Sequence, residues 1–444
     1  MRSSCAVTPA SESGLRLSEI LSALSYALDI TEGQSQGHAV RTGLIGMRLA
    51  EAIELPLAER GPLFYALLLK DLGCSSNAAR LCSLFGADDR ALKREHKLTD
   101  WARPLSSLAY ALRNAGLLRV ASLGVKERGS GRAMVQTRCD RGAEIAKMLG
   151  FTESTRAAIR ALDEHWDGRG LPHELGGTAI PLLGRIVGLA QTVEVFASNF
   201  GVEAAVAVAL ERRGTWFDPE LVDALKPLGR ESSFWERVMG PDPRSALAAV
   251  EPEDQILVAD ETRLDGIAEA FARVIDAKSP YTYRHSEGVA ELAVGIGREV
   301  GFGETELRDL RRAALLHDIG KLGVSNMILD KPDRLTDGEM AQIRLHPAYT
   351  QQILSRVAAF GGIVETAAAH HERLDGTGYH RGMPGGELSP MSRALAVADV
   401  CEALSADRPY RRGLSRDEVF EILRRQAGAG LCPASVEALA AHLG

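Results

Sequence analysis

The sequence predicts an all-α protein with two tandem helical domains. From Leu15 onward, most segments space their apolar residues with the period of a helix and end at short Gly or Pro breaks. Alternation of Val, Ile and Thr between hairpin turns is nearly absent, which argues against a sheet. The second half also repeats motifs of the first half at a long offset, which indicates a duplicated domain rather than a solenoid.

The predicted elements follow the chain in order. Residues 1–14 are Ser-rich and are expected to be disordered. A polar stretch with several prolines, residues 240–254, predicts a domain boundary, and residues 264–275 predict the helix that leads into the second domain. The predicted limits are 1–14 for the disordered N-terminus, 15–240 for the first domain, 241–262 for the linker and 263–444 for the second domain.

The composition excludes several classes of function. With 45% hydrophobic and 25% charged residues among 444, the chain resembles ordinary soluble globular proteins. A net charge of −7 provides no basic field for a nucleic-acid polymer or an anionic membrane, although a local cluster of Arg and Lys would suit a small anionic ligand. No apolar run has the length of a membrane span or the form of a signal peptide. Because the six cysteines are scattered without a CxxC pair, we expect a reducing, cytoplasmic location.

The internal repeat has two registers. Residues 167–172 (DGRGLP) recur 208 residues later as 375–380 (DGTGYH), and residues 185–191 match 393–399 at the same offset. Upstream, residues 67–73 (LLLKDLG) match 314–320 (ALLHDIG) at an offset of 247, and His38 matches His285. Since the offsets differ by about 40 residues, the first half carries an insertion within 72–138.

The repeat exposes a contrast between the halves. The second half has His285, His317, Asp318, Lys321, His346, His370, His371 and Asp399, where the first half has His38, Lys70, Asp71, Cys74, Cys139, Leu162, Asp163 and Gln191. Lys70 in place of a histidine would repel a cation. We interpret the first half as a copy that keeps the fold and has lost a metal site. The alternative is a metal site that uses Cys139 and Asp163 in new roles.

The motif at residues 313–321 (AALLHDIGK) carries the chemistry. The apolar residues before His317 share its helix face, so the His317 imidazole and the Asp318 carboxylate are expected to face the core. Burying both groups unpaired costs several kcal/mol, and a metal ion would pair with both. Lys321 follows one turn later, where its ammonium would reach the same site.

Further histidines and an aspartate occur in similar contexts. His285 faces inward on its helix, His346 precedes a proline at a helix start, and the pair at 370–371 closes an apolar helix. The predicted metal ligands are His285, His317, Asp318, His346, His370, His371 and Asp399. Because seven ligands exceed the needs of one ion, we predict two divalent transition-metal ions, iron or manganese first, with zinc, nickel or cobalt as alternatives. Two ions bridged by a carboxylate and a hydroxide hydrolyse phosphate esters, and Lys321 would stabilise charge or protonate the leaving oxygen.

These motifs resemble the HD-GYP family, bacterial metal-dependent phosphodiesterases for cyclic dinucleotides, chiefly cyclic di-GMP. The resemblance covers roughly residues 265–440 and rests on 281–286 (YTYRHS), 317–324 (HDIGKLGV), 331–332 (KP), 335–336 (LT), 346–347 (HP), 370–379 (HHERLDGTGY), 398–400 (ADV) and 408–411 (RPYR). The first half resembles a degenerate HD domain only through the repeat.

The resemblance implies a role for each matching residue. One ion would be held by His285, His317, Asp318 and Asp399, and the second by His346, His370 and His371, with Asp318 bridging. Lys321 and Asp318 would be catalytic, and Tyr379, Arg408 and Arg411 would contact the nucleotide or its phosphates. The implied activity is hydrolysis of cyclic di-GMP to linear pGpG by a metal-bound hydroxide.

Two departures from the family pattern affect this expectation. His380 replaces the proline of the Gly-Tyr-Pro signature, which puts loop stiffness in doubt and leaves His380 as an additional ligand to consider. Tyr281 stands where some members have a carboxylate for a third metal, so pGpG is favoured over complete conversion to GMP.

Three alternatives stay open from the sequence. The substrate could be another cyclic dinucleotide such as 3'3'-cyclic GMP-AMP, because the chain has the tandem layout. The chain could also be a non-catalytic cyclic-dinucleotide sensor, a reading that fits the first half best. A homodimer and signalling protein partners are compatible with a domain that has lost its metal ligands.

Overall fold

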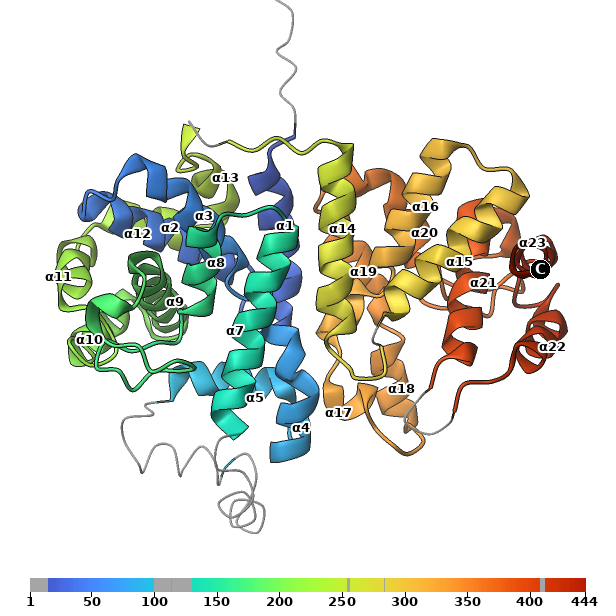
Figure 1. The fold of residues 1–444 in the computed structure, drawn as a ribbon, viewed down its shortest axis with the longest axis horizontal. Helices are drawn as coiled ribbons and strands as arrows, with labels where there is room; N and C mark the ends of the chain where they lie inside the picture. Colours follow the sequence, from blue (N-terminus) through green and yellow to red (C-terminus); the bar gives the residue numbers. More distant parts are fainter. Residues whose placement is uncertain (1–14, 100–112, 114–129, 254–255, 283, 408–411) are drawn as a thin grey trace, which may run out of the picture.

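The computed structural model describes residues 15–99, 113, 130–253, 256–282, 284–407 and 412–444. Across these ranges the chain forms α-helices and short 3₁₀ helices, with isolated β-bridges and no strand. The prediction of an all-α fold is therefore confirmed. The predicted disorder of 1–14 concerns residues outside the described ranges. In Figure 1 the helices up to α13 and the helices from α14 onward form two lobes that lie side by side.

The first lobe contains the helices of the first sequence half. They are α1 (Leu17–Thr31), α2 (His38–Ala52), α3 (Leu57–Leu69), η1 (Cys74–Asn77), α4 (Ala78–Phe85), α5 (Asp89–Leu98), α7 (Ser130–Met148), α8 (Glu153–Arg160), η2 (Gly177–Ala179), α9 (Leu182–Phe200), α10 (Val202–Glu211), α11 (Pro219–Leu228), α12 (Ser232–Met239) and α13 (Pro243–Ala248). Thus α13 lies inside the segment predicted as a linker, and its Leu247 is buried where α13 packs on α2. The domain limits themselves stay a prediction.

The second lobe contains the remaining helices. They are α14 (Glu261–Asp276), α15 (His285–Val300), α16 (Glu304–Leu316), η4 (Ile319–Gly323), α17 (Asn326–Leu329), α18 (Asp337–Ile343), α19 (His346–Leu354), η5 (Ala358–Phe360), α20 (Gly361–Ala368), η6 (Gly385–Glu387), α21 (Pro390–Ser405), α22 (Arg416–Gln426) and α23 (Pro433–Leu443). Several begin at a side-chain cap: Asp260 caps α14, Ser389 caps α21 and Ser415 caps α22, and each accepts a backbone N–H of the first turn.

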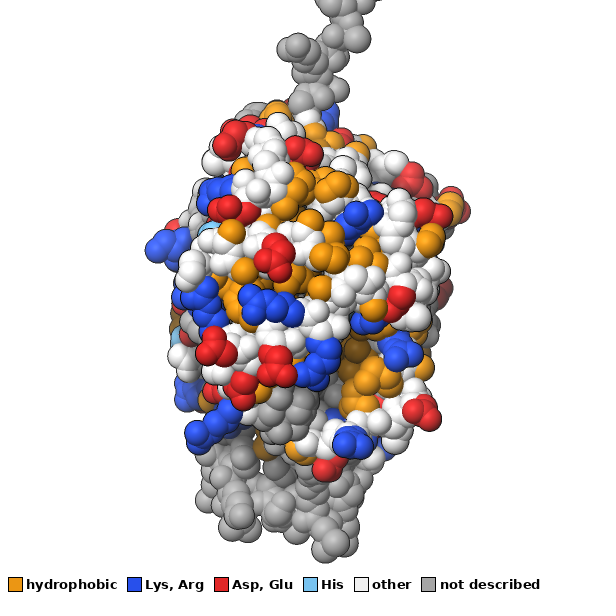
Figure 2. Space-filling model, turned by 90° about the vertical axis from the view of Figure 1, so that its right-hand side faces the viewer, with side chains coloured by type: hydrophobic (Ala, Val, Ile, Leu, Met, Phe, Trp, Pro, Cys, Tyr) orange, Lys and Arg blue, Asp and Glu red, His pale blue; other side chains and the backbone are white. Residues whose placement is uncertain are grey.

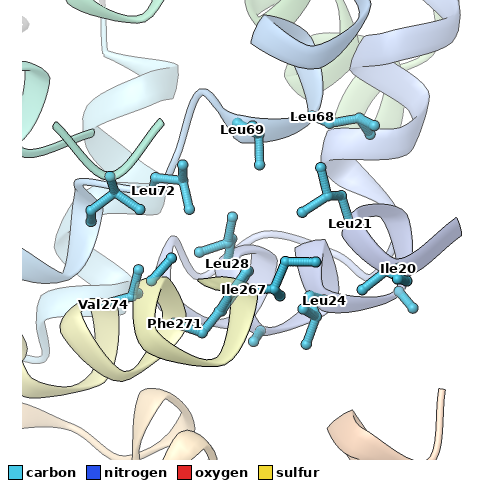
Figure 3. Close-up of a cluster of buried hydrophobic side chains, with 14 of the residues drawn as sticks. Ile20, Leu21, Leu24, Leu28, Leu68, Leu69, Leu72, Ile267, Phe271 and Val274 are labelled. Carbon is cyan, nitrogen blue, oxygen red and sulfur yellow. The ribbon is translucent and has the colours of Figure 1, made fainter. Parts of the chain in front are cut away.

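The apolar core continues from one lobe into the other. Ile267, Phe271 and Val274 of α14 belong to the same buried cluster as Leu24 and Leu28 of α1, and Figure 3 shows these side chains together. Each of these side chains is almost fully buried. Because burying one large apolar side chain stabilises by about 1.5–3 kcal/mol, this cluster holds the lobes against each other. α1 also packs on η4 and α19, which belong to the second lobe.

A matching carboxylate starts the corresponding helix in each half. Asp29 accepts the backbone N–H groups of Gly37 and His38 at 2.7 and 3.1 Å, where α2 begins. Asp276 accepts the backbone N–H and the hydroxyl of Ser286 at 3.2 and 2.7 Å, where α15 begins. The carboxylates satisfy backbone donors that the first helical turn leaves unpaired. In this way each half fixes the helix that starts with its matching histidine.

The surface has no field of one sign on the face that Figure 2 shows, at the end of the second lobe. Basic and acidic side chains alternate there with small apolar areas, and the net charge of the whole chain is −7. Among the described residues, no helix combines the length and apolar character needed to cross a bilayer.

Candidate metal centre

The seven predicted ligands come from five places in the second lobe. His285 is the first residue of α15, His346 is the first residue of α19, and Asp399 lies in the middle of α21. The pair 317–318 follows the last residue of α16, and the pair 370–371 follows α20. All of them are buried except His371, whose side chain is 26% exposed. Helix ends therefore deliver most of the site, as the sequence predicts.

The Asp318 carboxylate lies at the centre of the imidazoles. Its Oδ2 is 3.3 Å from Nε2 of His317 and 3.5 Å from Nε2 of His285. Its Oδ1 is 3.3 Å from Nε2 of His346 and 3.7 Å from Nε2 of His370. The two oxygens therefore face two different pairs of histidines.

The donor atoms gather in overlapping groups, each within 4.8 Å. These groups are His285 with His317 and Asp399, His346 with His370 and His371, and His317 with Asp318 and His370. Nε2 of His317 and Oδ1 of Asp318 are buried without a hydrogen-bond partner. An unsatisfied buried polar atom costs free energy, so these two atoms fit a cation that the protein would bind here. Nitrogen and oxygen donors without a thiolate suit iron, manganese and similar divalent ions.

The outer ring nitrogens are held so that Nε2 faces the centre. Nδ1 of His317, His346 and His370 donates to the backbone carbonyl three residues earlier, at 2.6, 2.7 and 2.6 Å. Nδ1 of His285 pairs instead with the Glu402 carboxylate. Such partners fix the tautomer and the ring orientation of a metal-binding histidine. The sequence-based prediction missed Glu402, although it lies one turn after Asp399 on α21.

The electrostatics favour the metal-binding protonation state for Asp318 and His371. Burial lowers the pKa of His285 and of His317, but the neighbouring carboxylates outweigh burial and raise both. Burial raises the pKa of Asp318, but the charges of His317 and Lys321 outweigh burial and hold it well below the ordinary value. Burial and the neighbouring His346 lower the pKa of His371 to about 3. Lys321 donates to Asp318 at 2.5 Å. At neutral pH the carboxylate is ionised and the His371 imidazole is neutral, as ligands must be.

Tyr379 covers one side of the site. Its ring lies 4.7 Å from the ring of His371, with an angle of 35° between the planes. The guanidinium of Arg344 lies 5.4 Å from the centroid of Tyr379, so a cation lies beside this ring. The sequence-based prediction missed Arg344, because an exposed arginine before a histidine carries no distinctive pattern. Of the predicted substrate contacts, Arg408 and Arg411 lie outside the described residues.

His380 does not join the ligands. Its Nε2 lies 3.2 Å from Oε1 of Gln351 on α19. The loop is held by Glu372, which accepts the backbone N–H groups of Arg381 and Met383 at 2.8 and 2.9 Å. His380 lies outside the donor groups described above, and its role as an additional ligand stays a prediction. The buried Glu372 carboxylate organises this loop.

Comparison with known proteins identifies the fold of both lobes. A family model described as "HD domain" matches residues 73–221 and 269–432. The chain belongs to the HD domain family. A 3'3'-cGAMP-specific phosphodiesterase of Vibrio cholerae is 41% identical over 432 residues, which cover 95% of this chain and 94% of that protein.

Further relatives support the resemblance to the HD-GYP group, which is confirmed. The crystal structure of a cyclic GMP-AMP-specific phosphodiesterase of V. cholerae has a TM-score of 0.67 and 37% identity, covering 97% of this chain and 98% of that chain. A cyclic di-GMP phosphodiesterase of Pseudomonas aeruginosa is 39% identical over 150 residues, which cover 33% of this chain and 35% of that protein.

The first HD domain fills the corresponding position with side-chain cations. Lys70, at the place of His317, donates to Nε2 of His38 at 2.9 Å and also pairs with Asp71. Nδ1 of His38 pairs with Glu194, as His285 pairs with Glu402 in the second HD domain. An ammonium therefore sits against the imidazole nitrogen that would otherwise be free for a metal.

The expected match of Cys139 to His346 is wrong by one residue. A Cβ on Gly320 would lie 1.9 Å from the backbone oxygen of His346, and a Cβ on Gly73 would lie 1.9 Å from that of Arg138. The two glycines match each other in the repeat, so Arg138 is the counterpart of His346. Arg138 also forms an ion pair with Asp163, which leaves a guanidinium where the cryptic site of Cys139 and Asp163 was considered.

One group of potential ligands in the first HD domain was not predicted. Donor atoms of Glu32, Asp71 and Cys74 lie within 4.8 Å of one another. Lys97 lies among them, with its Nζ 2.9 Å from Glu32 and 3.6 Å from Asp71. Because burial raises the pKa of Cys74, its thiol stays protonated. The charge of these carboxylates is thus balanced by lysines of the chain itself.

Proposed function

We propose that this chain is a metal-dependent phosphodiesterase that cleaves a phosphodiester bond of a cyclic dinucleotide at its second HD domain. The observation that carries the proposal is the position of the Asp318 carboxylate, each of whose oxygens faces two imidazole nitrogens. The buried, unpartnered atoms at His317 and Asp318 support a cation between them. A sensor that only binds nucleotide has no need for this convergence of donors.

The donor groups divide the predicted ligands between two ions. His285, His317 and Asp399 would hold the first, and His346, His370 and His371 the second, with Asp318 shared between them. When bound, such a pair of ions lowers the pKa of a water molecule and neutralises charge on the phosphoryl oxygens. The donor set suits iron or manganese first, with zinc, nickel or cobalt as alternatives.

Lys321 supplies a proton and a positive charge beside the phosphoryl group. Its ammonium is 2.5 Å from Asp318 and its side chain is 22% exposed, so it contacts both the centre and solvent. From that place it would stabilise the transition-state charge or donate a proton to the leaving oxygen. Tyr379, with Arg408 and Arg411 outside the described residues, would bind the nucleotide.

We infer 3'3'-cyclic GMP-AMP as the first substrate to test and cyclic di-GMP as the second. The relative matched over 95% of this chain is a 3'3'-cGAMP-specific phosphodiesterase. The P. aeruginosa cyclic di-GMP phosphodiesterase is matched over only 33% of this chain. This order reverses the expectation from the sequence, and linear dinucleotide stays the expected product because Tyr281 supplies no further carboxylate.

Product analysis of the full-length protein tests this function. The protein is supplied anaerobically with Fe²⁺ or Mn²⁺ and offered a panel of cyclic dinucleotides. We expect wild type to yield a linear dinucleotide and Asp318→Ala to yield none. Asp223→Ala, which removes an exposed carboxylate of the first HD domain, is the control and should be active. A wild type that binds nucleotide without turnover would support the sensor instead.

A further inference from the structure

The first HD domain places a fully buried carboxylate at two segments of the second. Asp89, at the start of α5, is 0% exposed. We propose that Asp89 is a positioning residue for the metal centre of the second HD domain. The proposal rests on the function proposed above, and it gives the domain without a metal site a direct part in that function.

Each oxygen of Asp89 contacts a different segment. Oδ2 lies 3.4 Å from Nζ of Lys278, in the segment between α14 and His285. Oδ1 accepts the backbone N–H of Asn326 at 3.1 Å, where α17 begins just after η4. The first segment leads into a predicted ligand, and the second follows the helix that contains Lys321. One carboxylate therefore fixes the spacing between them.

The two segments are also tied to each other around this carboxylate. Nδ2 of Asn326 donates to the backbone oxygen of Lys278 at 2.6 Å and to Asp330 at 2.6 Å. The hydroxyl of Ser279 donates to the other oxygen of Asp330 at 2.5 Å. These contacts form a closed polar cluster whose centre comes from the first HD domain. Because Asn326, Ser279 and Asp330 are joined by side-chain hydrogen bonds, the network favours one arrangement of its members.

The next residue, Arg90, contacts the end of η4 directly. Nη1 of Arg90 donates to the backbone oxygen of Gly323 at 2.5 Å. Gly323 is the last residue of η4, and Lys321 lies two residues before it. The turn at 89–90 thus holds the end of the helix that carries the proposed proton donor.

Asp89 is also held in place by contacts within the first HD domain. Nζ of Lys93 lies 3.8 Å from Asp89 and 3.7 Å from Glu32, and Glu32 pairs with Lys97 at 2.9 Å. The lysines that balance charge in the first HD domain therefore extend as a buried ionic chain to Asp89. The Asp89 carboxylate therefore contacts Lys93 in the first HD domain and the segments of Lys278 and Asn326 in the second.

Removing Asp89 would leave a buried ammonium without its partner. Lys278 is 2% exposed, and its ammonium contacts the Asp89 carboxylate. An unpaired buried charge is strongly unfavourable, so the segment of Lys278 would shift to find another partner or water. Small displacements at a reacting centre cost much of the rate, because the reacting groups must be held in a narrow geometry. We therefore expect a loss in turnover rather than a loss of the bound ions.

The test compares Asp89→Ala with a matched variant in the full-length, metal-loaded protein. Asp218→Ala also removes a buried, ion-paired carboxylate of the first HD domain, but its partner Arg185 lies in the same domain. We expect Asp89→Ala to lower kcat about tenfold, with KM and metal content within about threefold of wild type. Deuterium exchange should rise in residues 278–286 and 319–326 for Asp89→Ala and stay unchanged there for Asp218→Ala.

Two further variants keep the test decisive. Lys278→Met removes the same ion pair from the other side and should reproduce the loss in kcat. Asp89→Asn keeps an oxygen for the Asn326 N–H and should retain more activity than Asp89→Ala. Wild-type kcat in Asp89→Ala, or equal losses in Asp89→Ala and Asp218→Ala, would overturn the proposal.

The outcome also separates this proposal from the proposed function. If wild type turns over no cyclic dinucleotide, the proposed function fails, and the exchange measurement still decides whether Asp89 orders the two segments. If wild type is active and Asp89→Ala is equally active with unchanged exchange, only the positioning role fails.

Discussion

The ammonium of Lys70 lies 2.9 Å from Nε2 of His38, and Lys70 holds the chain position that His317 holds in the second HD domain. The first HD domain thus has a covalently attached cation where the second presents an imidazole to a shared centre. Burial and the charge of Lys70 both lower the pKa of His38, so its imidazole is neutral against that ammonium.

Lys321→Met should lower kcat by about 10²–10³-fold with metal content unchanged, because it removes a charge that stabilises the transition state and leaves the ligands in place. Steady-state kinetics together with metal analysis by mass spectrometry checks this. Lys226→Met, which removes an exposed lysine of the first HD domain, should behave as wild type. Loss of metal in Lys321→Met would show that the lysine acts by organising Asp318 instead.

Glu402→Gln should weaken metal affinity by about 10–100-fold, because the carboxylate that orients His285 loses its charge. Competition with a chelator of known affinity measures the change. The matched variant Glu194→Gln alters the same contact in the first HD domain, at His38, and should leave metal affinity unchanged. Equal metal affinity in Glu402→Gln and wild type would show that Glu402 does not support metal binding by orienting His285.

Glu194 should make the first HD domain acid-sensitive. Burial raises its pKa, but the hydrogen bonds that His38 and Ser198 donate and the charge of Arg41 outweigh burial and lower it from 4.5 to about 2. Because the pKa is lowered on folding, this stabilisation is complete above about pH 4.5 and is lost as the pH falls toward 2. Glu194→Gln should cost about 3 kcal/mol at neutral pH, and its difference from wild type should shrink below pH 4.5.

Urea unfolding at several pH values, followed by tryptophan fluorescence, measures this difference. All four tryptophans precede residue 240, so the signal reports on the first HD domain. A constant difference between Glu194→Gln and wild type from pH 7 to pH 3 would contradict the assignment of the lowered pKa to this carboxylate.

Arg344→Ala should raise KM about tenfold with kcat within about threefold of wild type, because the guanidinium beside Tyr379 lies where a substrate phosphate would approach. Arg298→Ala, an exposed arginine at the end of α15, is the control. Arg344→Lys keeps the charge but not the planar stacking and should fall between the two. An unchanged KM in Arg344→Ala would leave Arg344 as a surface residue.

The sequence alone was sufficient for the helical class and for the set of converging side chains. Helical periodicity depends on local spacing, and histidines at helix starts or ends are visible beside Pro347 or after the apolar run before His370. The internal repeat also allowed matching positions of the two halves to be compared. That comparison distinguished the half with the predicted metal ligands from the half without them.

Other features depend on contacts between distant segments and were not predictable from local patterns. Glu402 reads as an ordinary helical surface residue until the fold brings it to His285. The offset of 208 residues already places Arg138, not Cys139, opposite His346, and the close approach of Gly73 to Arg138 confirms that register. The contacts of Asp89 with Lys278 and Asn326 cross between domains, and no spacing in the sequence encodes them.

The lysines and arginine that balance charge in the first HD domain make that domain independent of bound metal. They are part of the polypeptide, so the buried carboxylates of the first HD domain have their counter-charges as soon as the chain is synthesised. The second HD domain would instead take the proposed metal ions from solution. When metal ions are scarce, the first HD domain would thus stay folded while the second HD domain stays inactive until ions return.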